Sequence, residues 1–232
     1  MILNRVLVVV AHPDDEVLGC GGLIDKLIKN KKKVKVIFLA EGSSCRFSDN
    51  NNKSKLENVI RSRKIFAKNA MSSLKVKEYV FYNLRCGALN TYSLIYINQI
   101  IEKEIKIFKP DTIITHHSDD CNVDHNIIYK SVLISSRPVP NSTIKNVICF
   151  EVLSSTEWNF DEKFKPNFFV DIEDNIKSKI MAFKEYYSSE GKNFPFPRSL
   201  KGIKVLANYR GMQIGVKNAE AFRIIRSLEH WK

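Results

Sequence analysis

The sequence predicts an α/β domain in which helices cover a mostly parallel central sheet, and two observations support this. Short apolar runs alternate with longer amphipathic stretches along the chain, as strands alternate with helices in such folds. The chain has 232 residues, of which 44% are hydrophobic, which is enough for one sizeable core. We therefore expect one domain over residues 1–232, with a core of about 1–152 and residues 153–232 packed on it.

The individual elements of this core follow from the apolar runs and their boundaries. Strands are expected at Val6–Val10, Val34–Leu39, Glu78–Tyr82, Thr112–Thr115 and Asn146–Glu151. Helices are expected near Val17–Lys29, Lys53–Asn69, Ser93–Phe108 and His125–Ser135. Pro110 cannot continue a helix, so the third helix ends before it.

The pattern is less regular in the last third of the chain. The run PNFFVDI at 166–172 predicts an edge strand, and Asp174 or Asn175 can cap a helix that continues to about Tyr187. Residues 193–200, NFPFPRSL, are rich in proline and aromatic side chains and predict a loop packed on the body. A final helix is expected near Ala219–Leu228.

Composition excludes several classes of protein. The five cysteines are scattered and form no C-x-x-C pair, which argues against a disulfide framework and favours a reducing cytoplasm. The amino terminus lacks a basic segment, and its apolar run is too short for a bilayer, so neither a signal peptide nor a membrane span is expected. The net charge of +12 is spread along the chain, which makes nucleic-acid binding unlikely.

Histidines and acids gather where two strands are expected to end. The first strand runs into AHPDDE at 11–16 and the fourth into THHSDDCNVDH at 115–125, and these segments hold four of the five histidines. Ligands of open α/β sheets bind at the carboxyl ends of strands. Imidazoles with one carboxylate are typical zinc ligands in hydrolytic sites, and a second carboxylate can accept a proton from the attacking water.

These segments resemble a known family. AHPDDEVLGCGG at 11–22 resembles the signature of the LmbE-like or PIG-L family of zinc-dependent N-acetylglucosaminyl deacetylases, and NVDH at 122–125 is similar to its second motif. Further similarity extends through EVLSSTEW at 151–158 to RGMQIGVKNAEAF at 210–222. The resemblance implies a Rossmann-like layered domain, without a dinucleotide, that hydrolyses an N-acetyl amide on an amino sugar and releases acetate.

The resemblance also implies roles for particular residues. His12, Asp15 and His125 would be the metal ligands, with zinc as the expected ion and iron or cobalt as substitutes. Asp14 would be the general base. Asn122 stands where many relatives have a histidine; it can donate a hydrogen bond to an oxyanion but cannot deliver a proton.

Two residues are candidate substrate contacts. Arg46 aligns with a family arginine after the second strand and can bind a sugar hydroxyl or a phosphate. His117 adjoins His116 at the end of the fourth strand, and the sequence does not decide which of the two points inward. The expected partner is a small N-acetylated sugar, and a sugar linked to a nucleotide is one version of this substrate. Whether the protein forms a homo-oligomer is left open.

Three alternatives remain beside this interpretation. An amidase acting on a thiol-sugar conjugate would use the same chemistry within the same family. A dinucleotide-binding enzyme is disfavoured, because G-x-G-x-x-G beginning at Gly19 requires glycine where Ile24 stands. A basic nucleic-acid-binding module would explain the charge but not the clustered histidines and acids.

Overall fold

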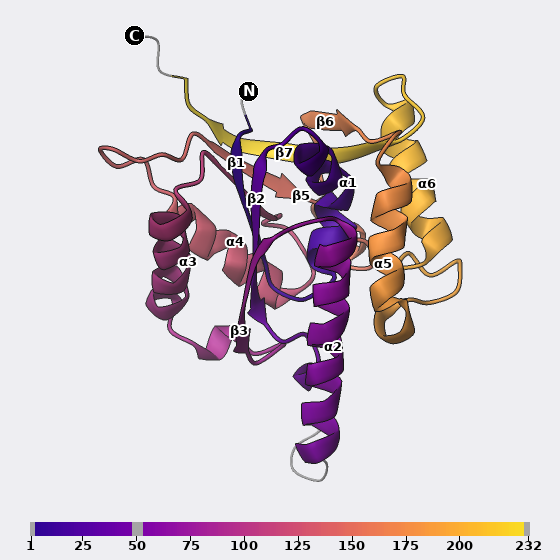
Figure 1. Ribbon diagram of the computed structural model, residues 1–232, viewed down its shortest axis with the longest axis horizontal. Coiled ribbons are helices and arrows are strands. Elements are labelled where there is room, and N and C mark those ends of the chain that lie inside the picture. Colours follow the sequence, from indigo (N-terminus) through magenta and orange to yellow (C-terminus); the bar gives the residue numbers. More distant parts are fainter. Residues whose placement is uncertain (1–2, 48–52, 230–232) are drawn as a thin grey trace.

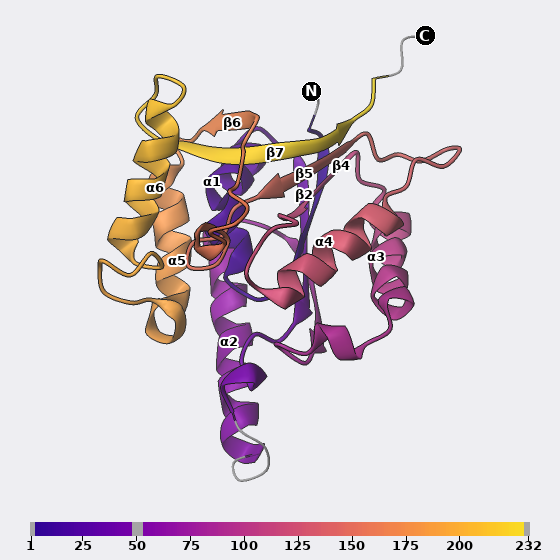
Figure 2. The ribbon, with the colours of Figure 1, turned by 180° about the vertical axis from the view of Figure 1, so that it is seen from behind.

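The computed structural model describes residues 3–47 and 53–229 and forms the expected sheet with helices on both faces (Figures 1 and 2). Within these residues the sheet has seven strands in the order β3-β2-β1-β4-β5-β7-β6. The strands are β1 (Arg5–Val10), β2 (Lys33–Ala40), β3 (Glu78–Leu84), β4 (Thr112–His116), β5 (Asn146–Phe150), β6 (Phe168–Asp171) and β7 (Ala219–Ser227). The helices are α1 (Asp15–Lys29), α2 (Lys53–Ser73), α3 (Leu94–Phe108), α4 (Val123–Ser135), α5 (Ile176–Glu190) and α6 (Leu200–Met212). Three short 3-10 turns cover Ser44–Arg46, Leu89–Thr91 and Thr156–Trp158.

Alternation along β1 divides the core between the two faces of the sheet. Val6, Val8 and Val10 pack in one apolar cluster with side chains of α1, α2, α5 and α6. Leu7 and Val9 point to the opposite face and pack with α3 and α4. Figures 1 and 2 show the same division, with α1, α2, α5 and α6 on one side of the strands and α3 and α4 on the other.

The predicted parallel sheet is confirmed for the first five strands. β2 and β4 flank β1, β3 lies outside β2, and β5 lies outside β4, all in parallel pairs. The chain leaves β1 through α1 on one face and leaves β4 through α4 on the other. The carboxyl ends of β1 and β4 therefore open a crevice at the point where the strand order reverses, which is where such sheets bind ligands.

The carboxyl-terminal third corrects two expectations. The helix predicted near Ala219–Leu228 is wrong: this segment is β7, which pairs antiparallel with β5 and β6. Its Phe222 side chain is fully buried, and pairing with β5 supplies the hydrogen bonds that a helix would have made internally, so tertiary context overrides a weak local preference. The sequence reading also missed α6, which begins where Ser199 accepts a hydrogen bond from the Gly202 N–H at 2.9 Å. The edge strand in 166–172 is confirmed as β6.

A buried ion pair holds α1 where its helical geometry breaks. Cys20 has φ −146°, so the helix is interrupted there. The carboxylate of Glu220, on β7, accepts hydrogen bonds from the N–H groups of Gly22 at 2.8 Å and Leu23 at 2.7 Å. Lys179 of α5 donates to Glu220 and also to the carbonyl of Leu18, at 2.7 and 2.8 Å. These contacts satisfy backbone groups released by the break and fix α1 beneath the end of β1.

No helix in the described part of the chain is both long enough and apolar enough to cross a membrane.

Candidate active site

The turn between β1 and α1 points two neighbouring carboxylates in different directions. Asp14 has φ 119°, a strained left-handed conformation for a residue other than glycine. The Asp15 carboxylate turns back and accepts a hydrogen bond from the backbone N–H of His12 at 2.8 Å. Asp15 thereby faces the end of β4, whereas Asp14 faces Arg63 and Arg198.

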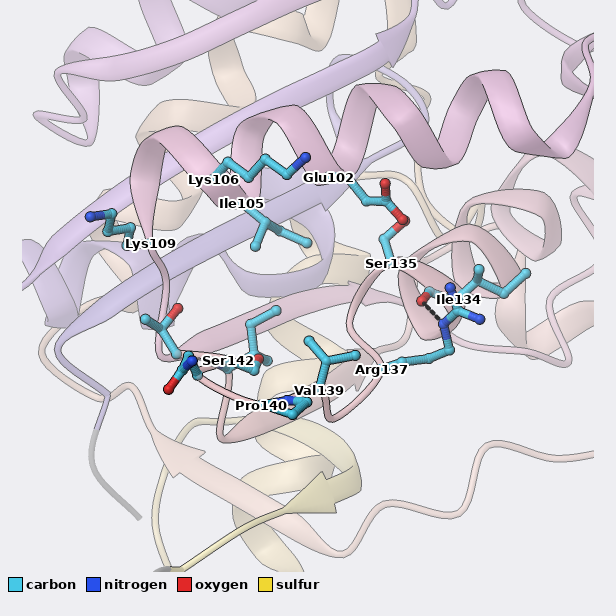
Figure 3. A pocket seen from close by; sticks show the side chains of 13 residues that line it. Glu102, Ile105, Lys106, Lys109, Ile134, Ser135, Arg137, Val139, Pro140 and Ser142 are labelled. Carbon is cyan, nitrogen blue, oxygen red and sulfur yellow. Dashed lines mark hydrogen bonds between the residues drawn. The ribbon is translucent and has the colours of Figure 1, made fainter.

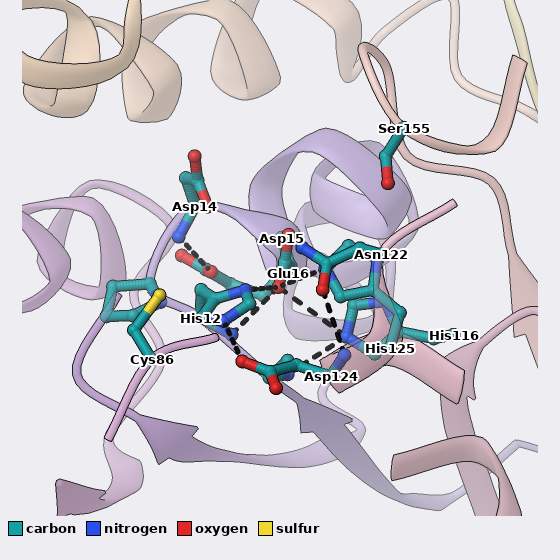
Figure 4. Close-up of polar contacts among 12 residues, drawn as sticks. His12, Asp14, Asp15, Glu16, Cys86, His116, Asn122, Asp124, His125 and Ser155 are labelled. Atoms are coloured by element: carbon teal, nitrogen blue, oxygen red, sulfur yellow. Dashed lines mark hydrogen bonds and ion pairs between the residues drawn. The ribbon is translucent and has the colours of Figure 1, made fainter. Parts of the chain in front are cut away.

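The three predicted metal ligands come together. Asp15 Oδ2 lies 3.4 Å from His12 Nδ1 and 3.4 Å from His125 Nε2, and all three side chains are buried. One donor atom from each lies within 4.8 Å of the others (Figure 4). Both ring nitrogens of His125 are buried and have no hydrogen-bond partner among the described residues, and Nε2 is the one that faces Asp15. Two imidazoles and one carboxylate with an unpartnered nitrogen suit a divalent cation such as zinc.

Two further acids fix the outer nitrogens of the imidazoles. Asp124 Oδ2 lies 2.9 Å from His12 Nε2, and Asp120 Oδ1 lies 3.1 Å from His125 Nδ1. The hydrogen bond with Asp124 selects the tautomer of His12 that directs Nδ1 toward a metal, whereas Asp120 is within ion-pair distance of His125 without a hydrogen bond. Asp120 is buried and accepts a hydrogen bond from the Thr156 hydroxyl at 2.7 Å, so a residue after β5 helps to hold it in place.

The charges of this cluster favour a cation. Burial alone would lower the pKa of His125, but Asp15 and Asp120 together raise it to about 10. Burial alone would likewise raise the pKa of Asp15, yet the neighbouring histidines hold it well below its usual range. Around the imidazoles of His12 and His125, the buried carboxylates outnumber the positively charged side chains. A positive charge placed between the two imidazoles is therefore stabilised.

His116 and His117 have different places, and neither lines the cavity beside these ligands. The His116 ring stacks on His125 at 3.8 Å, and its Nε2 accepts a hydrogen bond from the Ala11 N–H at 2.9 Å. Burial lowers the pKa of His116 to about 3, so this ring is a neutral support for His125. His117 packs edge-on against Phe164 instead, and the structure does not bring it to the site as a substrate contact.

A cavity of about 110 Å³ adjoins the ligands and includes the other predicted residues. Asp14, Arg46 and Asn122 all line it together with the three ligands. Asn122 begins α4, where its Oδ1 accepts a hydrogen bond from the Asp124 N–H at 2.9 Å, and its Nδ2 has no partner among the described residues. The side-chain amide of Asn122 therefore has a free N–H donor beside the cavity, and the start of α4 holds this side chain in place.

Three arginines and Glu190 form a network around Asp14 that the sequence reading did not find. Arg63 and Arg198 contact the two oxygens of Asp14 at 3.2 and 3.0 Å. Both also contact Glu190, the last residue of α5, and Arg46 donates to both Glu190 oxygens at 2.8 and 2.6 Å. These residues come from four separate segments, so no local spacing could have revealed them.

A larger cavity, of about 470 Å³, lies between the end of α3 and the segment that follows α4 (Figure 3). It adjoins Lys109 and Ile144, near the amino ends of β4 and β5, and is therefore at the opposite edge of the sheet from the ligands. Its lining has one carboxylate, Glu102, and neither histidine nor cysteine. The predicted site residues therefore line the smaller of these two cavities.

Comparison with solved structures finds the same fold in proteins that are named as deacetylases and in one that is named as a hydratase. N,N′-diacetylchitobiose deacetylase from Pyrococcus horikoshii superposes with a TM-score of 0.76 at 21% identity, over 97% of this chain and 84% of that one. The zinc-inhibited form of teicoplanin deacetylase Orf2 gives 0.73 at 14%, over 97% of this chain and 100% of that one. GalB, a 4-carboxy-2-hydroxymuconate hydratase from Pseudomonas putida, gives 0.74 at 19%, over 98% and 100%. At these identities the likeness establishes the fold.

Comparison with protein families is more specific. The family model described as PIG-L, GlcNAc-PI de-N-acetylase, matches residues 7–135. This match contains both segments that carry the histidines and acids of the site and covers more than half of the chain. The chain therefore belongs to the PIG-L family.

Proposed function

We propose that this protein is a zinc-dependent N-deacetylase that hydrolyses the N-acetyl amide of an amino sugar or sugar conjugate and releases acetate. The observation that carries the proposal is the convergence of His12, Asp15 and His125, with Asp14 beside them on the same cavity. Membership of the PIG-L family supports the reaction, and the donor set supports a divalent metal.

The metal would be held by His12 Nδ1, Asp15 Oδ2 and His125 Nε2. A zinc ion held there would lower the pKa of a water towards about 7 and would polarise an acyl oxygen. Iron and cobalt suit the same donors. Teicoplanin deacetylase Orf2, which has a similar fold, has a zinc-inhibited form, so the native metal of this protein must be identified by direct measurement.

Asp14 serves in this proposal as the proton carrier. Its carboxylate faces the cavity and is positioned by Arg63 and Arg198, which leave lone pairs on both oxygens. Asp14 takes a proton from the water that attacks the acetyl carbon, and it returns that proton to the sugar nitrogen as the C–N bond breaks. Asn122 donates its free amide hydrogen to the carbonyl oxygen as negative charge develops there.

Arg46 is the proposed substrate contact at the mouth of the cavity. Its side chain is 48% exposed although it pairs with Glu190. A guanidinium so placed can bind a sugar hydroxyl or a phosphate, which is compatible with a nucleotide-linked substrate. A thiol-sugar conjugate would meet the same residues, so an amidase of that kind stays open as the alternative.

The test combines a substrate panel with one variant. Acetate release is measured from N-acetylated sugars, nucleotide sugars and thiol-sugar conjugates, with the protein loaded in turn with zinc, iron or cobalt and then treated with a chelator. The Asp14→Asn variant should keep the metal content of the unaltered protein and lose about 100- to 10,000-fold in turnover. Unimpaired turnover in this variant would remove Asp14 from its role, and full metal occupancy in His12→Ala would reject that ligand.

A further inference from the structure

Two thiols face each other at the rim of the site cavity, on loops that follow neighbouring strands. Cys45 lies in the turn after β2 and is exposed, whereas Cys86 follows β3 and is buried. Their Sγ atoms are 3.2 Å apart, and both residues line the cavity. The hydrogen bond from Cys86 lowers the pKa of the Cys45 thiol to about 6. An accessible thiolate with a second thiol in contact is the arrangement of redox-sensitive cysteine pairs.

The backbone around these thiols is held by one buried carboxylate. Glu41, directly after β2, accepts hydrogen bonds from the N–H groups of Ser43 at 2.6 Å and of Cys86 at 2.9 Å. The two loops therefore keep a fixed separation while the thiols are reduced. A disulfide requires the sulfurs to approach from 3.2 Å to about 2.0 Å, so they must move closer by about 1.2 Å.

The loop that carries Cys86 is connected through Asp124 to the proposed metal ligand His12. The N–H of Gly87 donates to Asp124 Oδ2 at 2.6 Å, and the same oxygen lies 2.9 Å from His12 Nε2. Cys86 Sγ itself lies within 4.8 Å of donor atoms of both His12 and Asp124. Figure 4 shows Cys86 beside His12, with Asp124 below them. A displacement of Cys86 and Gly87 therefore moves a hydrogen bond that orients His12.

We propose that Cys45 and Cys86 form a thiol pair that hydrogen peroxide oxidises to a disulfide, and that this disulfide weakens metal binding through Gly87 and Asp124. The proposal rests on the metal site of the proposed function. The Cys45 thiolate attacks one peroxide oxygen, the O–O bond breaks, and the other oxygen leaves as water after taking up a proton. Cys86 then attacks the resulting sulfenic sulfur, the S–O bond breaks and a second water leaves, so two thiols are oxidised while one peroxide is reduced.

The test uses the full chain loaded with zinc and hydrogen peroxide as the oxidant. After graded exposure the peroxide is removed with catalase, free thiols are alkylated, and the mass of the protein and of its peptides is measured. Zinc affinity is measured before and after oxidation by competition with a chromophoric chelator, and again after reduction with dithiothreitol. Cys45→Ser and Cys86→Ser remove one partner each, and Cys121→Ser is the matched control because Cys121 is exposed and outside the pair.

The expected product is a Cys45–Cys86 crosslink in the unaltered protein and in Cys121→Ser, and none in the other two variants. Zinc affinity should fall about tenfold to 100-fold on oxidation, the range for loss of contacts that orient a ligand, and should recover on reduction. Oxidation of Cys121 to higher acids with no Cys45–Cys86 crosslink would overturn the proposal. A crosslink that leaves zinc affinity unchanged would overturn the coupling to the metal site. Neither readout requires deacetylation, so failure here is separate from failure of the proposed reaction.

Discussion

Replacing Asp124 with asparagine tests whether an outer hydrogen bond determines metal binding. Asp124 Oδ2 accepts from Gly87 N–H at 2.6 Å and lies 2.9 Å from His12 Nε2, while Oδ1 accepts from Leu89 N–H at 3.0 Å. The carboxylate can accept from all three donors. Asparagine has the same shape, but one of its two positions becomes an NH₂ group and can no longer accept.

The two orientations of the new amide give the size of the effect. If the NH₂ group faces Leu89, that buried N–H loses its acceptor at a cost of about 1–3 kcal/mol in stability, and His12 keeps a weaker, neutral acceptor. If it faces His12 instead, it donates to Nε2 and places the ring proton on Nδ1, the atom that must face the metal. We therefore expect zinc affinity to fall about tenfold to 100-fold, or about 1.4 to 2.7 kcal/mol.

Zinc affinity is measured by chelator competition at fixed pH, together with the thermal midpoint of the metal-free protein. Asp119→Asn is the control, since it makes the same charge change on an acid whose side chain is 36% exposed and which contacts His117, away from the ligands. A lower midpoint with unchanged zinc affinity would reduce Asp124 to a structural role. Affinity within twofold of the unaltered protein, in a folded Asp124→Asn variant, would refute the reasoning.

Two further substitutions test how α1 is held beneath the site. Lys179→Met leaves the buried carboxylate of Glu220 without its cation, so the free energy of unfolding should fall by about 3–5 kcal/mol in denaturant titration. Lys177→Met, on the exposed side of the same helix, should change it by less than about 0.5 kcal/mol, and equal effects at both positions would contradict the assignment. Gly19→Ala places a Cβ 2.2 Å from the ring of Phe150, so a loss of about 1–3 kcal/mol is expected, and a neutral result would show that the ring moves freely.

The first five strands, and the gathering of histidines and acids at the ends of two of them, could be predicted because their signals are local. Each strand is a short apolar run, and His12 and Asp15 lie within four residues of one another, as do Asn122 and His125. A parallel sheet that reverses its strand order between β1 and β4 brings those two segments together without further information. Sequence patterns are therefore most informative where one turn supplies several functional groups.

The rest of the site depends on contacts between distant segments, which leave no local pattern. Arg63 reaches the cavity from the middle of α2, where a lone arginine is indistinguishable from the solvated charges around it, yet its side chain is only 3% exposed. Arg198, in the loop before α6, contacts Asp14 and Glu190, while Glu157 accepts from backbone N–H groups. The wrong prediction of a helix at β7 has the same origin, because pairing with β5 makes that segment a strand.

The division of labour between the adjacent residues Asp14 and Asp15 follows from these distant contacts. Asp15 lies among buried imidazoles whose outer nitrogens already face Asp120 and Asp124, so negative charge is in excess and a cation is stabilised there. Asp14, one residue earlier, is surrounded by arginine side chains that satisfy its charge without a metal. The strained turn at φ 119° keeps the two carboxylates in these opposite surroundings. Asp15 is therefore placed among the imidazoles and Asp14 among the arginines, although the sequence presents them as the same residue repeated.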